Sequence, residues 1–169
     1  GATIWSERYE GTTKDVFAVQ DSITRSIVGA LEVRLAGSAR PEALKGTRDL
    51  EAYDLYLRAI PHYRSQREEG NAEAVRLASR ATELEPDNAV FLAFAAHVLQ
   101  QRSIFTWAPL GPDDTGRIAD WVERALANSA GNTWVLGFCG SALIQHFKDY
   151  ERGMVAIREA VRANPNNMA

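Results

Sequence analysis

The side chains that could carry nucleophilic or metal chemistry in this sequence are a single cysteine and three histidines. Cys139 and His146 lie seven positions apart on one expected helix, so they share a face but are about 10 Å apart along its axis. A cysteine–histidine pair needs a direct hydrogen bond to activate the thiol. We therefore expect Cys139 to be a buried, small apolar residue, and we expect no catalytic residue in the chain.

The order Cys139-Gly140-Ser141 also occurs around the nucleophile of papain-like proteases, but the cysteine and aromatic residue that follow there are missing. Only about 30 residues remain after Cys139, whereas the partner histidine of those enzymes lies more than roughly 100 residues downstream. A hydrolytic function would rest on this cysteine alone. Gly137 and Gly140 have no lysine or preceding strand beside them, so they are predicted to be close-packing positions and not a phosphate loop.

The histidines do not form a metal-binding pattern. His62, His97 and His146 come from three different predicted hairpins, and no metal-ligand spacing relates them. Asp113-Asp114 lacks the further oxygen ligands that a calcium loop needs at fixed intervals, and it is predicted to form a turn and to cap the following helix. The sequence therefore predicts no metal site and no cofactor.

The composition excludes two classes of partner. The 19 basic and 22 acidic residues give a formal charge of −3 and are interspersed, whereas nucleic-acid binding would need a basic stripe. The longest apolar run, residues 89–96, is too short to cross a bilayer, so we expect no membrane partner. A lone cysteine excludes an internal disulfide framework and indicates a reducing, cytoplasmic location.

The elements that position these residues are best defined in residues 71–88, NAEAVRLASRATELEPDN. Small residues recur there at Ala74, Ala78 and Ala81, and Pro86 then ends the helix. A helix with such a small-residue face has to lie very close to its neighbours. Packing, and not chemistry, is the predicted role of this stretch.

Two further stretches repeat the pattern. In residues 149–166, Pro165 follows Ala160 by five positions, as in the first stretch. A weaker copy at residues 117–128 carries Ala125 but has no proline. Because each copy follows another apolar helix, the sequence predicts an all-α protein of stacked antiparallel helical hairpins, a short α-solenoid.

Capping and breaking residues set the boundaries of the first hairpin. Asp49 is expected to cap a helix over residues 50–66, in which Pro61 should produce a kink or mark a boundary. Residues 67–70 are expected to turn the chain into the stretch that begins at residue 71.

The later boundaries follow from the same signals. Asn88 should cap residues 89–102, a helix that is apolar nearly all round and so should be the most buried. Residues 103–114 contain two prolines and a glycine and are predicted to form a loop. Either Asn132 or Thr133 should cap the next apolar helix.

The amino-terminal part differs from the rest. Residues 2–9 alternate in polarity and predict one strand, which needs a partner outside this sequence because a lone strand is not stable in water. Residues 13–35 predict a helix with an apolar stripe, and residues 37–48 are the best linker candidate.

Residues 49–169 resemble about three tetratricopeptide repeats, at about 49–88, 88–131 and 132–166. The residues that carry the resemblance are Ala74, Ala81, Pro86, Ala125, Tyr150, Gly153, Ile157, Ala160 and Pro165. The segment TIWSERYEGTTKDVFAVQDSITRSIVGAL, followed by DLEAYDLYLRA, is similar to the junction in bacterial multidomain proteins where a TolB-like α/β domain passes into such repeats.

Many proteins of this kind carry a class III adenylate cyclase domain upstream. The resemblance implies that residues 1–36 are the end of an α/β domain and that the repeats are a docking or sensing module of a signalling enzyme. None of the metal-binding aspartates or purine-binding residues of a cyclase can be placed on this sequence, so the chain itself is not expected to be an enzyme.

A concave surface lined by the first helices is where a protein or peptide is expected to dock, including an upstream domain of the same polypeptide. The polar residues expected on it are Arg58, His62, His97, Gln101, Ser141 and Gln145. The first hypothesis is a non-catalytic protein-interaction or regulatory module. The alternative is a sensor whose peptide or small-molecule ligand lies in the groove under the 103–114 loop, with Trp107 as a lid.

We also expect self-association through the exposed strand or the last helix pair, because the chain resembles a fragment cut at both ends.

Overall fold

The computed structural model describes residues 47–164, and every regular element in that range is a helix. The helices are α3 (Leu50–Arg64), α4 (Glu68–Leu84), α5 (Ala89–Ile104), α6 (Asp114–Ala127), α7 (Thr133–Gln145) and α8 (Tyr150–Ala163). The predicted strand at 2–9, the predicted helix at 13–35 and all but the end of the predicted linker lie outside the described residues.

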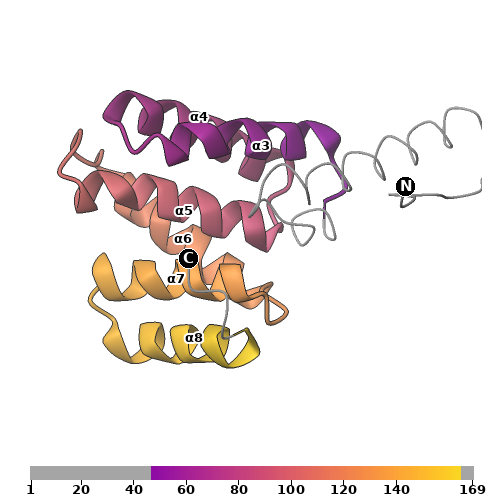
Figure 1. Cartoon of the computed structure of the whole chain (residues 1–169), viewed down its shortest axis with the longest axis vertical. Helices are drawn as coiled ribbons and strands as arrows, with labels where there is room; N and C mark the ends of the chain where they lie inside the picture. Colours follow the sequence, from indigo (N-terminus) through magenta and orange to yellow (C-terminus); the bar gives the residue numbers. More distant parts are fainter. Residues whose placement is uncertain (1–46, 165–169) are drawn as a thin grey trace, which may run out of the picture. The chain divides into compact units, whose positions relative to one another are not determined.

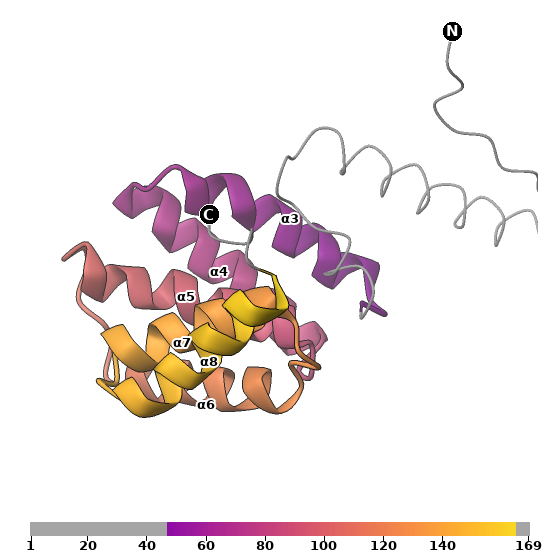
Figure 2. The same ribbon diagram turned by 60° about the horizontal axis from the view of Figure 1, so that its bottom comes forward.

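The helices form three hairpins, α3/α4, α5/α6 and α7/α8, which stack in chain order (Figure 1). Each second helix packs on the first helix of the next hairpin, α4 on α5 and α6 on α7, and α5 also packs on α7. In the turned view, α8 lies in front of α7, and α6 forms the lower edge of the stack (Figure 2). The predicted all-α stack of helical hairpins is confirmed.

Three asparagine and aspartate side chains cap the helices as expected. Asp49 Oδ1 accepts hydrogen bonds from the backbone N–H groups of Glu51 and Ala52, at 2.8 and 3.2 Å. Asn88 caps α5 in the same way, and Asn132, not Thr133, caps α7. Such caps satisfy donors that the first helical turn leaves without a partner.

Two of the predicted boundaries are wrong. Residues 67–70 do not form the turn, because α4 begins at Glu68; Glu68 and Glu69 are good helix formers and their charge favours the positive helix N-terminus. Asp113 makes no capping hydrogen bond. Asp114 does form the predicted turn, since its carboxylate accepts from the backbone N–H of Gly111 at 2.8 Å. Pro61 lies three residues before the end of α3, close to a boundary.

The α5 helix is the most buried element, as its apolar composition predicts, with ten buried residues between Phe91 and Gln101. A polar bridge fixes its register against α4. Asn71 Nδ2 donates to the carbonyl of Val98 at 2.7 Å, and Asn71 Oδ1 accepts from Arg102 Nε at 3.1 Å. Because Asn71 is buried, both of its amide atoms need these partners.

The two glycines of α7 have opposite surroundings. A Cβ atom on Gly140 would lie 2.9 Å from the Ile157 side chain and 3.1 Å from the carbonyl oxygen of Gly153, so α7 and α8 are in direct backbone contact there. A Cβ atom on Gly137 would meet nothing within 4 Å. The close-packing prediction is therefore confirmed for Gly140 and wrong for Gly137.

Candidate functional site

A row of half-buried aromatic side chains crosses the first helices of the three hairpins. We call Tyr56, Tyr63, His97, Trp134 and Phe138 the aromatic face. The Tyr63 and His97 rings are 5.6 Å apart, His97 stacks on Phe138 at 4.4 Å with an interplanar angle of 16°, and Trp134 meets Phe138 edge-on at 5.1 Å. The face therefore runs from α3 through α5 to α7.

Buried aromatic rings of α5 pack against the inner side of this row. The ring of Tyr56 lies 5.3 Å from Phe91 and 5.1 Å from Phe94, and Phe94 also meets Tyr63 edge-on at 5.5 Å. Phe91 and Phe94 belong to the main hydrophobic core. The outer rings are thus held by rigid neighbours and do not have to be ordered when a partner binds.

His97 is a neutral, hydrogen-bonded ring at the centre of the aromatic face. Its Nε2 lies 3.2 Å from the Tyr63 hydroxyl, and its Nδ1 is buried without a hydrogen-bond partner. Burial lowers the pKa of His97 to about 4, because the apolar surroundings disfavour the charged form. Burial also raises the pKa of Tyr63, which the charge of Arg64 partly offsets. Neither ring is suited to proton transfer at neutral pH.

Two glutamines extend the polar part of this site along α5. The amide nitrogen of the fully buried Gln100 lies 3.5 Å from Gln145 Oε1 on α7. The Oε1 atoms of Gln100 and Gln101 are buried and have no hydrogen-bond partner. An unsatisfied buried amide oxygen costs about 1–3 kcal/mol. Together with His97 Nδ1, these two oxygens are unpartnered polar atoms in the interior beside the aromatic face.

Space for a bound molecule exists beside α7. Gly137 lies one turn from both Trp134 and Ser141, so the three residues share a stripe of the helix. A Cβ atom on Gly137 would meet nothing within 4 Å, so the helix surface is open at this position, one turn from Trp134. Ser141 is half-buried in the next turn.

The predicted groove residues are not all brought together. His97, Gln101, Ser141 and Gln145 lie on α5 and α7 at or next to the aromatic face, although Gln101 is only 5% exposed. Arg58 is two positions from Tyr56, which is about 200° around the helix, and it pairs with the Asp54 carboxylate at 3.4 Å.

His62 and Trp107 also lie away from the aromatic rings. His62 is exposed in the last turn of α3, about 100° around the helix from Tyr63. Trp107 is half-buried and stacks on Phe105 at 4.8 Å. Its loop is attached to the start of α4, where the backbone N–H of Ala108 donates to Glu68 at 2.9 Å.

The expected packing role of Cys139 is confirmed. The residue is fully buried, and burial, followed by the charge of Glu123, raises the pKa of its thiol to about 12. His146 is half-buried and meets the Phe147 ring edge-on at 4.8 Å; burial and then Lys148 lower its pKa. No cluster of metal-ligating side chains occurs in residues 47–164.

Sequence reasoning did not identify Tyr56, Tyr63, Trp134 or Phe138 as site residues; it placed only polar residues on the expected surface. Tyr56 and Tyr63 are seven residues apart on α3, and Trp134 and Phe138 are four apart on α7, so each pair shares a helix face. That spacing was a usable signal. The spacing within each helix does not show, however, that the aromatic faces of α3, α5 and α7 meet in the folded chain.

Comparison with known proteins relates the chain to one part of a longer protein. It is 33% identical, over 127 residues or 75% of its own length, to a protein of Rhizobium meliloti (strain 1021) named "Putative adenylate cyclase 3". The chain spans 22% of that protein's length. No family model matches the chain, and no solved structure reaches the similarity required of a match. In the described part, no helix is both long and apolar enough to span a membrane. The comparison thus relates this helical-repeat chain to a segment of an adenylate cyclase-like signalling protein.

Proposed function

We propose that the chain is a non-catalytic, tetratricopeptide-type interaction module of a cytoplasmic adenylate cyclase-like signalling protein. In this proposal the aromatic face binds a peptide, or a peptide-like segment of another domain of the same polypeptide. The similarity to one segment of "Putative adenylate cyclase 3" supports the signalling context. The stacked hairpins support the module, because helical repeats present extended surfaces to proteins and peptides.

The aromatic face is the observation that carries the proposal. Half-buried aromatic rings provide large apolar contact area with few rotatable bonds, and such residues dominate the binding energy of protein interfaces. The unpartnered oxygens of Gln100 and Gln101 lie on the same helix as His97 but are buried, so a peptide N–H would reach them only after these side chains rotate towards the aromatic face. A face of this composition fits a peptide that places an apolar side chain on the rings and forms hydrogen bonds through its backbone.

A catalytic function has no support among the described residues. The thiol of Cys139 is buried with a raised pKa, and His97 is neutral and hydrogen-bonded to Tyr63. We therefore expect the purified chain to form no cyclic AMP from ATP and magnesium. Reproducible turnover that scales with the concentration of the chain, and that survives repurification, would contradict the proposal.

Binding is tested by a steric change that leaves the fold intact. Gly137→Gln places a neutral side chain on the aromatic face, and nothing within 4 Å of its Cβ is displaced. Gly116→Gln on α6 is a matched control, because that helical glycine is also unobstructed but lies on a second helix. Peptides are selected from a random library on the immobilised chain, and their affinities are measured by fluorescence anisotropy.

We expect Gly137→Gln to weaken the selected peptides at least about tenfold and Gly116→Gln to leave them unchanged. Equal affinities for the two variants would show that the peptides bind elsewhere. If the selection yields no peptide whose binding to the chain saturates, that result would also count against the proposal.

A small-molecule sensor is the second candidate, and the unpartnered acceptors on α5 favour it. Its ligand would be a compound rich in N–H or O–H donors. A metabolite screen that follows tryptophan fluorescence, with Trp107→Phe as the control, separates the two. A saturable change that persists in Trp107→Phe and disappears in Trp134→Phe would place the ligand at the aromatic face and favour the sensor.

A further inference from the structure

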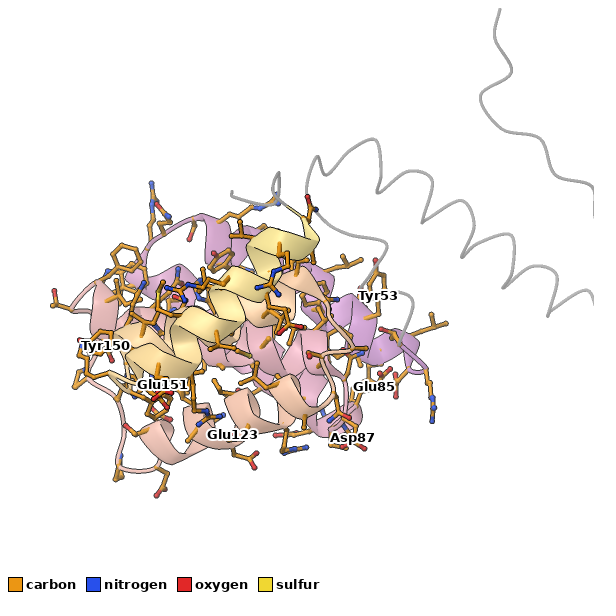
Figure 3. The ribbon with its side chains drawn as sticks, turned by 90° about the horizontal axis from the view of Figure 1, so that it is seen from below. Tyr53, Glu85, Asp87, Glu123, Tyr150 and Glu151 are labelled. Atoms are coloured by element: carbon orange, nitrogen blue, oxygen red, sulfur yellow. The ribbon has the colours of Figure 1, made fainter. Side chains whose placement is uncertain are left out.

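The last helix of the stack carries an apolar stripe that no described residue covers. Tyr150, Met154 and Val161, which we call the α8 stripe, are 59%, 40% and 40% exposed. Their spacing places them on one side of the helix. Figure 3 looks at the molecule from below, where α8 lies in front of the other helices with Tyr150 in its first turn.

The equivalent positions of the first hairpin are buried by the next helix. Aligning Ala81 with Ala160 places Asn71, Val75 and Thr82 in register with the α8 stripe. These three residues of α4 are only 2%, 9% and 6% exposed, because α5 packs on α4. Asn71 also donates directly to a backbone carbonyl of α5.

The second hairpin repeats this arrangement in part: Thr115, in register with Tyr150, is exposed, whereas Ala119 and Leu126, in register with Met154 and Val161, are half-buried. Leu126 of α6 is in register with Thr82 when Ala125 is aligned with Ala81, and it packs against the cluster that Leu136, Ala156 and Ala160 form in the α7/α8 hairpin. On both inner second helices, a residue in register with the stripe contacts the following hairpin: Asn71 contacts α5, and Leu126 contacts the α7/α8 hairpin. The α8 stripe is therefore built as a stacking surface for another helix.

The distribution of exposed apolar side chains over the described surface indicates which surface could pack on the α8 stripe. The large apolar side chains that are exposed are Leu50, Ile104, Phe105, Tyr150, Met154, Val155 and Val161, and four of the seven belong to α8. The helix at the opposite end, α3, exposes the charged residues Glu51, Asp54 and Arg58. Stacking of α8 on α3 of another copy would thus bury charges against apolar side chains, at a cost.

We propose that the α8 stripe of one chain packs against the α8 stripe of a second copy, across a two-fold axis. A two-fold contact pairs the same patch with itself, as a self-complementary stripe requires. The proposal is independent of the proposed function, because it concerns a different helix.

Charges beside the stripe favour an antiparallel pair of helices. Glu151 flanks the stripe near the start of α8, and Arg158 and Arg162 flank it near the end. When Tyr150 of one copy is level with Val161 of the other, Glu151 is within about one turn of both arginines of the second copy. In a parallel pair about a two-fold axis, Glu151 of each copy would lie on the opposite side of the contact from the arginines of the other copy, so these charges would not pair.

Sedimentation equilibrium of the full 169-residue chain tests the proposal. We expect a reversible dimer, and we expect Met154→Glu combined with Val161→Glu to weaken it at least about tenfold, because four carboxylates would be buried at the contact. Val155→Glu is the matched control: this residue is 60% exposed on α8 but lies about 120° around the helix from the stripe. It should leave the dimer unchanged, and circular dichroism should show equal helicity in all chains.

A second measurement places the contact on the helix. The native Cys139 is fully buried, so a short bismaleimide crosslinker should join two copies of Met154→Cys and leave Val155→Cys uncrosslinked. A wild-type chain that stays monomeric over the whole concentration range would overturn the proposal. A dimer that the two glutamates do not weaken, or that Val155→Glu weakens equally, would also overturn it.

Discussion

Single residues in this protein owe their chemistry to burial more than to their type. Cys139 and His97 are the residue types that most often carry out catalysis, yet the apolar surroundings stabilise the neutral form of both. Both lie against the hydrophobic core, and among the described residues the polar partner of His97 is the Tyr63 hydroxyl. Each residue therefore acts in packing and not in proton or acyl transfer.

Cys139 should react very slowly with thiol reagents. A thiol with a pKa of about 12 is almost entirely protonated at pH 8, and its sulfur is also inaccessible. We expect labelling by a disulfide reagent to be at least about 100-fold slower than for a free cysteine and to become fast in urea. Fast labelling of the folded chain, measured by absorbance, would contradict this placement.

The stability of the fold should depend on pH through His97. Because folding lowers the pKa of His97 from its ordinary 6.5 to about 4, the unfolded chain binds this proton more tightly than the folded chain does. The contribution of His97 is complete above pH 6.5, falls as the pH drops towards 4, and changes no further below. The loss over this window is up to about 3 kcal/mol.

Urea unfolding at several pH values between 7 and 4 checks this expectation. His97→Gln keeps a hydrogen-bonding group near Tyr63 but cannot titrate, so its free energy of unfolding should depend less on pH. Carboxylates such as Glu73 titrate in both chains and cancel in the comparison. Parallel profiles for the two chains would show that His97 is not the titrating group.

The helices show which features were predictable from the sequence. Asp49, Asn88 and Asn132 were recognised as caps because capping depends only on a side-chain acceptor next to its own helix. The order of apolar helices and small residues likewise predicted the stacked hairpins. These features are local, or they repeat along the chain.

The candidate site could be predicted only in part. His97 and Gln101 were placed on the correct helix, but their burial, and the contact of His97 with Phe138, depends on how α5 meets α7. Gly137 and Gly140 are identical in type and belong to one helix, yet only the second touches α8. Environments of this kind arise from tertiary packing, and a single sequence does not encode them in any short pattern.

Alanine substitutions at the two glycines should have opposite effects. Gly137→Ala should stabilise the protein by about 0.5–1 kcal/mol, because alanine favours the helix and the new methyl group meets nothing. Gly140→Ala should destabilise it by about 1–3 kcal/mol, because the methyl group would press on Ile157 and on the backbone of α8. Thermal unfolding monitored by circular dichroism measures both. A destabilising Gly137→Ala would show that its surroundings are filled.

At the scale of the whole stack, the second helices are also joined by arginines. Arg117 of α6 donates to Ser79 Oγ of α4 at 2.9 Å. Arg124 of α6 donates to the carbonyl of Pro86, in the turn that follows α4. Arg152 binds the two oxygens of Glu123 at 2.7 and 2.8 Å and connects α8 to α6. Because Arg152 and Glu123 are about half exposed, water and salt screen this pair, and the stack depends mainly on its buried apolar faces.

The stack thus presents two surfaces with different expected partners. The aromatic face belongs to the first helices and presents half-buried rings to a peptide, whereas the α8 stripe lies at one end and is apolar. Since the two surfaces involve different residues, substitutions that weaken one contact are expected to preserve the other. The Gly137→Gln and Met154→Glu chains can therefore be used as controls for each other.

The most direct measurement of the central claim follows the tryptophan indole N–H resonances of the ¹⁵N-labelled chain during titration with a selected peptide. Of the four tryptophans, Trp134 belongs to the aromatic face, Trp107 to the α5–α6 loop and Trp121 to α6, so these three report on different parts of the stack. If the aromatic face is the binding surface, the Trp134 resonance shifts in a saturable way and Trp121 does not move. A saturable shift of Trp121 or Trp107 with Trp134 unchanged would contradict the claim.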